Sequence, residues 1–301
     1  MTFDAHFHLL PKEVTGVASF YNEAWADIEG HLRAMDAVGV DKALVSYPTT
    51  DYHLKKGVPE AEAAREINAL TAKMLKRHRD RFAWLAVVPL TTPGPMLKEA
   101  SYAIGEGAAG FSMPTNNNGI YPDDPKFMEF FEEVQKSGRP VFLHPTTQTP
   151  FGHMELRHPL ITPVFQYAFD TSICLSRIIV SGMLGRLPKL KLVFASFGGV
   201  TPFLAGRFDR TYKMLLSRGY VKDFGEDPGE TLRRVYVDTS GTASESLLNL
   251  ALEVFGEDRL LWGSDYPANR EIEASIEAVR NLDIKEEAKN KILNINLADL
   301  F

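Results

Sequence analysis

Three histidines and one aspartate stand out because together they can bind a metal ion. His6 and His8 are separated by one residue. His144 follows a short apolar run, and Asp265 lies in a polar segment near the C-terminus. Residues two apart on a strand point to the same side, so His6 and His8 can hold one ion while Phe7 points away. Imidazole and carboxylate groups bind zinc, manganese, iron or cobalt, and a carboxylate can also accept a proton from a metal-bound water. Unrelated surface or core histidines would explain a single His-x-His pair, but the set of four favours a divalent metal site.

Eight short apolar segments are the predicted strands that position these side chains. Longer amphipathic segments separate them, which is typical of parallel strands joined by helices. The predicted strands are residues 2–8, 43–48, 82–90, 108–114, 140–145, 191–197, 235–240 and 260–267. Eight such units predict the α/β class and a single (β/α)8 TIM barrel over residues 1–301.

Two alternative folds fit the pattern less well. An open doubly wound sheet usually carries a glycine-rich phosphate turn after its first strand, and here that turn holds His6 and His8. An antiparallel sandwich would show apolar and polar residues in alternation, whereas residues 82–88 are almost continuously apolar. In a parallel barrel the carboxyl ends of the strands open on one mouth, so the candidate ligands converge there.

Elaborated loops are expected on this C-terminal face of the barrel. Residues 16–30, with Tyr21 and Trp25, follow the first strand, and the long stretch 144–190 follows the fifth. The first part of the longer stretch is rich in proline, threonine and glycine and is not regular helix. Each loop is interpreted either as a lid or as a surface insertion.

Composition excludes several classes of protein. Of 301 residues, 45% are hydrophobic and 24% charged, which is typical of a globular chain rather than a disordered or fibrous one. The net charge of −6 and the lack of a dense basic cluster disfavour nucleic acid as a partner. No apolar run reaches the roughly 18 residues that span a bilayer, and the single cysteine, Cys174, excludes an intrachain disulfide. We expect a cytoplasmic protein that acts on a small organic substrate, without a membrane partner.

Four motifs resemble those of the amidohydrolase superfamily, and within it the amidohydrolase 2 group, which includes aminocarboxymuconate-semialdehyde decarboxylase. They are residues 4–8 (Asp-Ala-His-Phe-His), 110–114 (Gly-Phe-Ser-Met-Pro), 142–145 (Phe-Leu-His-Pro) and 262–267 (Trp-Gly-Ser-Asp-Tyr-Pro). The resemblance implies a (β/α)8 barrel with one divalent metal held by four residues, namely His6, His8, His144 and Asp265.

The resemblance also implies a mononuclear site. Binuclear relatives carry a carboxylated lysine at the end of the fourth strand, and residues 108–114 contain no lysine. Zinc is the first expectation for the metal, with manganese or iron as alternatives, because the ligand set alone does not separate them.

The sixth strand departs from the family pattern. The family carries a histidine there that acts as a general acid/base or orients water, and Ser196 occupies its position. A serine hydroxyl does not accept a proton near neutral pH, so this change removes about 10²–10⁴-fold in rate unless another group compensates. Three interpretations stay open. Asp265 acts with the metal alone, a loop histidine such as His53, His153 or His158 reaches the site, or the chain binds ligands without catalysis.

Other residues are candidates for substrate binding. Arg207 matches a family arginine that reaches across a dimer interface to hold a substrate carboxylate, which implies an anionic substrate and at least a homodimer. A structural salt bridge with Asp209 or another acidic residue is the alternative role. The remaining candidates near the barrel mouth are Tyr47, His53, Asn117, His158 and Asn269. A solvated loop position is the alternative for the histidines, and turn formation for Asn117.

The leading functional hypothesis is a metal-dependent carboxy-lyase, a decarboxylase that acts on a small unsaturated or aromatic carboxylic acid. A metal-dependent hydrolase of an amide, lactone or carbon–carbon bond is the second hypothesis. A metal-binding barrel that has lost catalysis is the third, because Ser196 replaces the family histidine.

Overall fold

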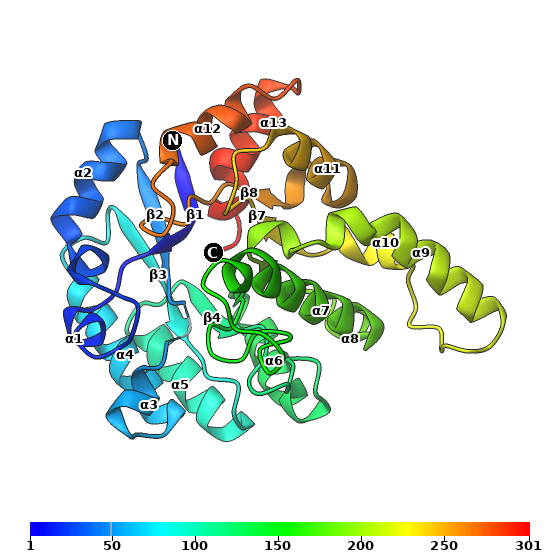
Figure 1. The fold of residues 1–301 in the computed structure, drawn as a ribbon, viewed down its shortest axis with the longest axis horizontal. Coiled ribbons are helices and arrows are strands. Elements are labelled where there is room, and N and C mark those ends of the chain that lie inside the picture. The colour runs from blue at the N-terminus through cyan, green and yellow to red at the C-terminus, as the bar shows by residue number, and fades with distance from the viewer. Residues whose placement is uncertain (49) are drawn as a thin grey trace.

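Eight parallel strands follow one another in chain order around the computed structural model, which describes residues 1–48 and 50–301 (Figure 1). The strands are β1 (Phe3–His8), β2 (Lys42–Ser46), β3 (Phe82–Val87), β4 (Gly110–Pro114), β5 (Val141–His144), β6 (Leu192–Phe194), β7 (Tyr236–Asp238) and β8 (Leu260–Leu261). The residues after β8 return to β1, because Ala5 N donates to Trp262 O at 2.9 Å and His8 N donates to Tyr266 O at 2.8 Å. The predicted (β/α)8 barrel is therefore confirmed.

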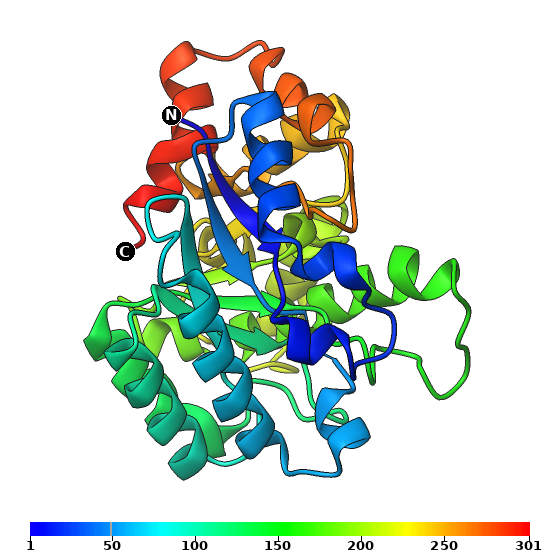
Figure 2. The ribbon, with the colours of Figure 1, turned by 90° about the vertical axis from the view of Figure 1, so that its left-hand side faces the viewer.

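Helices surround the strands on the outside (Figures 1 and 2). They are α1 (Lys12–Thr15), α2 (Ile28–Val38), α3 (Tyr52–Lys56), α4 (Glu60–Leu75), α5 (Pro93–Gly105), α6 (Met128–Ser137), α7 (Tyr167–Val180), α8 (Met183–Arg186), α9 (Thr201–Ser217), α10 (Pro228–Leu232), α11 (Glu245–Phe255), α12 (Ile272–Arg280), α13 (Glu286–Asn290) and α14 (Asn296–Ala298). In Figure 1, α9 extends away from the barrel at the right of the view. No helix in the described ranges has both the length and the apolar character needed to cross a membrane.

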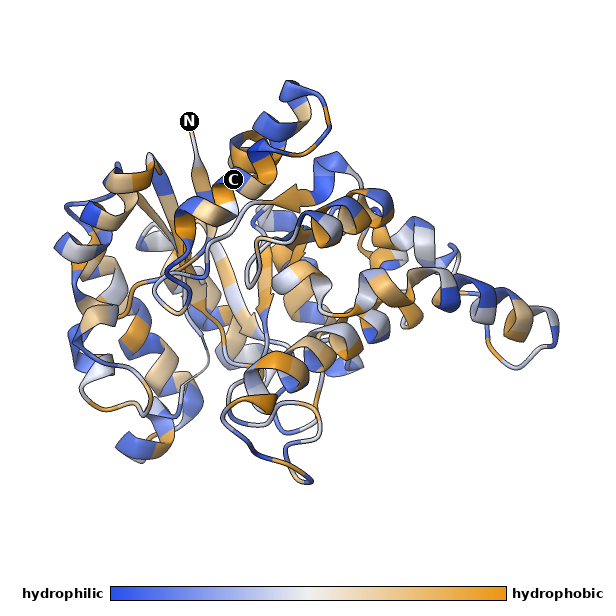
Figure 3. Cartoon of the chain, turned by 45° about the horizontal axis from the view of Figure 1, so that its top comes forward, coloured by the Kyte–Doolittle hydropathy of each residue, from blue (hydrophilic) through white to orange (hydrophobic). Residues whose placement is uncertain are grey.

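The core has two layers, which explains why the strands are apolar on both faces. The inner cluster fills the barrel with Phe3, Ala5, Leu44, Leu85, Phe142, Val193 and Leu261, and it is closed by Leu297 and Leu300 at the C-terminal end of the chain. The larger outer cluster lies between the strands and the helices. Figure 3 shows hydrophobic colours along the central strands and hydrophilic colours on the outer turns of the helices.

An irregularity in β1 decides where its histidines point. The pairing of β1 with β2 shifts register between Asp4 and Phe7. Ala5 packs in the inner cluster, whereas Phe7 packs in the outer cluster. Strict alternation would place these two side chains on the same face. The shift reverses the alternation, so that His6 and His8 face the interior.

The predicted strands are confirmed in number and order, but several of the predicted ranges continue past the carboxyl end of the observed strand. β6 ends at Phe194, because residues 196–199 all have positive φ angles. An added Cβ at Gly199 would collide with the carbonyl oxygen of Ala168. β8 contains only two residues, and its extension includes Asp265 with a φ of 62°. The sequence pattern continues through these segments, although their backbones leave the strand conformation.

The close approach of β1 to the segment after β8 predicts that Gly263→Ala destabilises the fold. A Cβ at this position would lie 2.6 Å from His6 Cβ and 3.2 Å from His6 N. We expect the free energy of unfolding to fall by about 1–3 kcal/mol, measured by urea denaturation. Gly105→Ala is the control, since its added Cβ meets no atom within 4 Å. Equal stability of the two variants would contradict the prediction.

Candidate active site

The three predicted histidine ligands lie together at the carboxyl ends of β1 and β5. One ligand nitrogen from each of His6, His8 and His144 lies within 4.8 Å of the others. The Nε2 atoms of His6 and His8 are 3.1 Å apart. His6 and His8 are buried, and His144 is partly buried.

Hydrogen bonds set the orientation of all three imidazole rings. Each Nδ1 atom faces an oxygen acceptor: Asp238 Oδ2 at 2.8 Å for His6, Ser46 O at 3.2 Å for His8, and Pro145 O at 2.9 Å for His144. A neutral imidazole with its proton on Nδ1 has its lone pair on Nε2. The three Nε2 lone pairs are thus available to a cation.

Asp265 completes the predicted ligand set from the loop after β8. Its Oδ1 atom lies 3.2 Å from His8 Nε2 and 3.6 Å from His6 Nε2. Its backbone N donates to His6 O at 2.8 Å, which ties the loop to β1. Burial raises the pKa of Asp265, but the hydrogen bond to His8 and the charge of His6 outweigh burial and hold the pKa below its ordinary value. Three imidazole nitrogens and one carboxylate oxygen fit a single divalent metal ion.

Burial and neighbouring charges move the pKa values of His6 and His144 in opposite directions. Burial lowers the pKa of His144 to about 3, and the charges of His6 and His8 act in the same direction. Burial also lowers the pKa of His6, but the carboxylate of Asp238 outweighs burial and raises it to about 9. His144 is therefore neutral at neutral pH, which is the form that binds metals.

Asp238 is a supporting residue that the sequence reasoning missed. It ends β7 and is buried. Besides contacting His6, it accepts hydrogen bonds from Ser196 N at 2.9 Å, Ser240 N at 3.1 Å and Ser240 Oγ at 2.6 Å. A carboxylate behind a metal-binding histidine fixes the ring and increases its basicity. The sequence signal that could have identified Asp238 was its place at the carboxyl end of a predicted strand.

Asp4 also supports the backbone around the candidate metal site. Its Oδ1 atom accepts from His6 N and from Ser264 N, each at 3.0 Å. Its Oδ2 atom has no hydrogen-bond partner among the described residues. Burial raises the pKa of this carboxyl group to about 7. Asp4 thereby joins β1 to the segment that carries Asp265.

The segment after β1 covers part of the site. Trp25 stacks on His8 with ring centroids 5.8 Å apart and an interplanar angle of 23°. Tyr21 meets Trp25 edge to face at 4.8 Å. This segment therefore supplies an aromatic wall beside a candidate metal ligand.

His31 of α2 supports the end of β1. Its neighbours in the sequence include charged residues, but its side chain is buried. Its Nε2 atom lies 3.0 Å from His8 O, and its Nδ1 atom lies 2.7 Å from Asp27 O. The α2 helix packs this face toward β1, so His31 supports the end of the strand.

Ser196 is connected to the candidate metal site by a hydrogen bond to Asp238. Its hydroxyl is 3.0 Å from Ser240 Oγ, and its backbone N is bound to Asp238. No described contact brings a loop histidine here. His53 Nε2 faces Glu60 Oε1 at 3.7 Å, and His153 Nδ1 faces Pro150 O at 3.0 Å.

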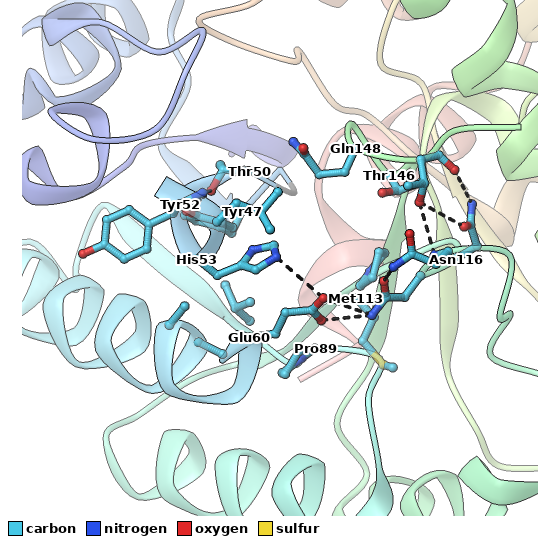
Figure 4. Close-up of a pocket in the computed structure, with 18 of the residues that line it drawn as sticks. Tyr47, Thr50, Tyr52, His53, Glu60, Pro89, Met113, Asn116, Thr146 and Gln148 are labelled. Carbon is cyan, nitrogen blue, oxygen red and sulfur yellow. Dashed lines mark hydrogen bonds and ion pairs between the residues drawn. The ribbon is translucent and has the colours of Figure 1, made fainter. Parts of the chain in front are cut away.

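The remaining candidates divide between a cavity and the surface. Tyr47 and His53 line a cavity (Figure 4), and Asn117 also lines it. Asn269 N donates to Asp265 O at 2.9 Å, so this residue touches the ligand loop. His158 is exposed, and its Nδ1 atom accepts from Leu160 N at 3.1 Å.

Arg207 lies exposed on α9. It makes no hydrogen bond or ion pair within the described residues, and Asp209 instead accepts from Gly229 N at 2.7 Å. The alternative of a salt bridge between Arg207 and Asp209 is therefore wrong for the isolated chain.

Comparison with known proteins agrees with this geometry. The family model described as amidohydrolase matches residues 3–301. The chain belongs to the amidohydrolase family. This assignment confirms the resemblance found in the four sequence motifs.

Several characterised proteins are similar to this amidohydrolase-family chain. Gamma-resorcylate decarboxylase of Rhizobium radiobacter is 26% identical over 297 residues, covering 89% of this chain and 87% of the relative. 2-Amino-3-carboxymuconate-6-semialdehyde decarboxylase of Dictyostelium discoideum is 24% identical over 297 residues, covering 89% of this chain and 82% of the relative. The crystal structure of 5-carboxyvanillate decarboxylase from Sphingomonas paucimobilis superposes with a TM-score of 0.86 at 24% identity, covering 100% of this chain and 98% of that one.

The contact between Asp238 and His6 predicts that Asp238→Ala weakens metal binding. Loss of such a supporting carboxylate lowers metal affinity about 10–100-fold. Competition with a chelator measures the affinity, and circular dichroism checks that the variant is folded. Asp299→Ala is the control, because Asp299 is exposed near the C-terminus. Unchanged affinity in a folded Asp238→Ala variant would refute the supporting role.

Proposed function

We propose that this amidohydrolase-family chain is a metal-dependent decarboxylase of a small unsaturated or aromatic carboxylic acid. The observation that carries the proposal is the convergence of His6, His8, His144 and Asp265 at the mouth of the barrel. The decarboxylases of gamma-resorcylate and aminocarboxymuconate semialdehyde, which are similar over most of the chain, support the choice of reaction.

One divalent ion would be held by the three histidines and Asp265. Bound there, it would supply a Lewis acid that polarises a substrate oxygen and orients the acid. We propose zinc from the ligand set, with manganese and iron as the alternatives. The structure of a dihydroxybenzoic acid decarboxylase from Polaromonas contains manganese, which supports testing that ion alongside zinc.

Asp265 is the proposed proton carrier, since Ser196 cannot act as a base near pH 7. Its carboxyl group is 28% exposed and exchanges protons with water between turnovers. In the reaction, the bond between the substrate carbon and its carboxylate breaks, and CO2 leaves. The electron pair stays on the carbon. Asp265 is a carboxylate at rest because its pKa is lowered, so it takes up a proton from solvent, passes it to the carbon and returns to the carboxylate form.

Arg207 is proposed to bind the substrate carboxylate of a second copy of the chain. Its exposed guanidinium has no partner within the described residues, and a planar fork binds both carboxylate oxygens. Phe203, one turn earlier on α9, is 82% exposed, which favours burial of this helix face in a homodimer. Tyr47, His53, Asn117 and Asn269 are proposed to surround the rest of the substrate. The role of His158 stays a prediction.

Metal content tests the ligand assignment. We expect about one equivalent of zinc, manganese or iron per chain by mass spectrometry of protein purified without added metal. The double variant His6→Ala, His8→Ala is expected to lose it, because two of the four donor groups are gone. His158→Ala, which removes an exposed histidine, is the control and should retain the metal. If wild-type protein bound no metal even after supplementation, the site assignment would be wrong.

A substrate panel tests the reaction. We expect the metal-supplied protein to release CO2 from hydroxybenzoic acids, and we expect Asp265→Asn to lower kcat by about 10²–10⁴-fold because the proton carrier is lost. The metal content of this variant is measured in parallel to separate proton transfer from metal loss. Acid production from amides or lactones without CO2 would instead indicate the hydrolase. Activity that appears only in Ser196→His would indicate a metal-binding barrel without turnover.

A further inference from the structure

A cavity of about 550 Å³ lies at the carboxyl ends of β2, β3 and β4 (Figure 4). None of the four candidate ligands lines it, so it is distinct from the metal site itself. Its lining comes from the ends of β2, β3 and β4, from α3 and α4, and from the loop after β5.

Three lining residues adjoin the groups that hold the ligands. Tyr47 follows Ser46, whose backbone O and Oγ lie 3.2 and 3.1 Å from His8 Nδ1. Pro114 pairs in register with His144, and Thr146 follows His144 by two residues. The cavity therefore adjoins His144 and the residue that contacts His8.

Apolar side chains form most of the inner wall. They come from α4 and from the ends of β3 and β4, and they are Ala63, Ala64, Ile67, Val87, Val88, Pro89, Met113 and Pro114. Such a wall stabilises a ligand by removing apolar surface from water. A charged body in this part of the cavity would lose hydration without gaining a partner.

Polar groups also line the cavity. Glu60 Oε2 accepts from Asn117 Nδ2 at 2.9 Å, and Glu60 Oε1 faces His53 Nε2 at 3.7 Å. In Figure 4 the side chains of His53 and Glu60 point toward each other. The Glu60 carboxylate already has partners within the protein, so it has no need of a ligand cation.

The size of the cavity bears on the size of its ligand. Pockets of roughly 300–1,000 Å³ hold drug-sized molecules. A single-ring acid whose carboxylate occupies the metal site would leave this neighbouring space to water. Solvated apolar walls favour a ligand that has an additional apolar part.

We propose that the cavity binds an apolar substituent of the substrate, an alkyl chain or a second ring, carried by the aromatic carboxylic acid whose carboxylate lies at the metal site. This inference rests on the proposed function, and it narrows the substrate class to acids larger than a simple hydroxybenzoate. α4 is then the specificity element, with Ala64 as the residue whose small side chain leaves room for the substituent.

Binding measurements with a graded series of ligands test this inference. The probes are 2-hydroxybenzoate and its propyl and pentyl derivatives at each open ring position, added to metal-supplied protein in a calorimeter. For at least one ring position, each added methylene is expected to tighten Kd about three- to fourfold. Ala64→Leu fills the cavity and is expected to weaken binding of the pentyl compound at least tenfold while changing the parent less than twofold.

Ala61→Leu is the matched control, because Ala61 lies on the same helix but does not line the cavity. Thermal denaturation checks that both variants fold, and Ile67→Phe is a second filling variant if Ala64→Leu does not.

The outcomes separate this inference from the proposed reaction. Chain-dependent tightening that is lost in the cavity variant supports the inference, even if no compound releases CO2. Turnover of the parent without any gain from the longer chains overturns it and leaves the decarboxylase standing. Absence of tightening at every ring position, or equal tightening in Ala64→Leu, also overturns it.

Discussion

The site depends on the oxygen atoms that lie behind the three imidazole rings. Each Nδ1 atom faces an acceptor, so each ring in its neutral form directs the lone pair of its Nε2 atom inward. Two such lone pairs 3.1 Å apart repel each other unless a proton or a cation lies between them. The carboxylate of Asp265 adds negative charge at the same point. The barrel thus concentrates electron-pair donors where a divalent ion relieves their repulsion.

This arrangement requires residues from several strands to be placed together. β1 supplies two rings only because its register shift reverses the alternation of side chains. β7 supplies the carboxylate of Asp238 behind His6, and the segment after β8 is bound to β1 through backbone hydrogen bonds. Since these residues are far apart in the sequence, the site forms only when the barrel closes. Stability of the fold and affinity for the metal are therefore coupled.

Sequence reasoning predicted the features that follow from regular periodicity. Apolar runs identified the eight strands, and polar residues at their carboxyl ends identified His6, His8, His144 and Asp265. Features that depend on local departures from periodicity were not predictable in the same way. The end of β6 and the positive φ of Asp265 are set by tertiary contacts, and burial of His31 depends on which face α2 turns to β1. Asp238 was missed because a single aspartate at a strand end has no spacing pattern of its own.

Residue 196, in the left-handed turn after β6, has separate roles for its backbone and its side chain. The contact with Asp238 uses the backbone N of Ser196, and among the described residues its hydroxyl is hydrogen-bonded to Ser240 Oγ. Any residue that tolerates a φ of 52° can keep the backbone contact, which favours serine, asparagine, aspartate and histidine over branched side chains. Evolution can therefore exchange an acid–base side chain for a hydroxyl at this position without losing the backbone contact to Asp238, which supports His6. A lineage can change its chemistry here while it inherits the same metal site.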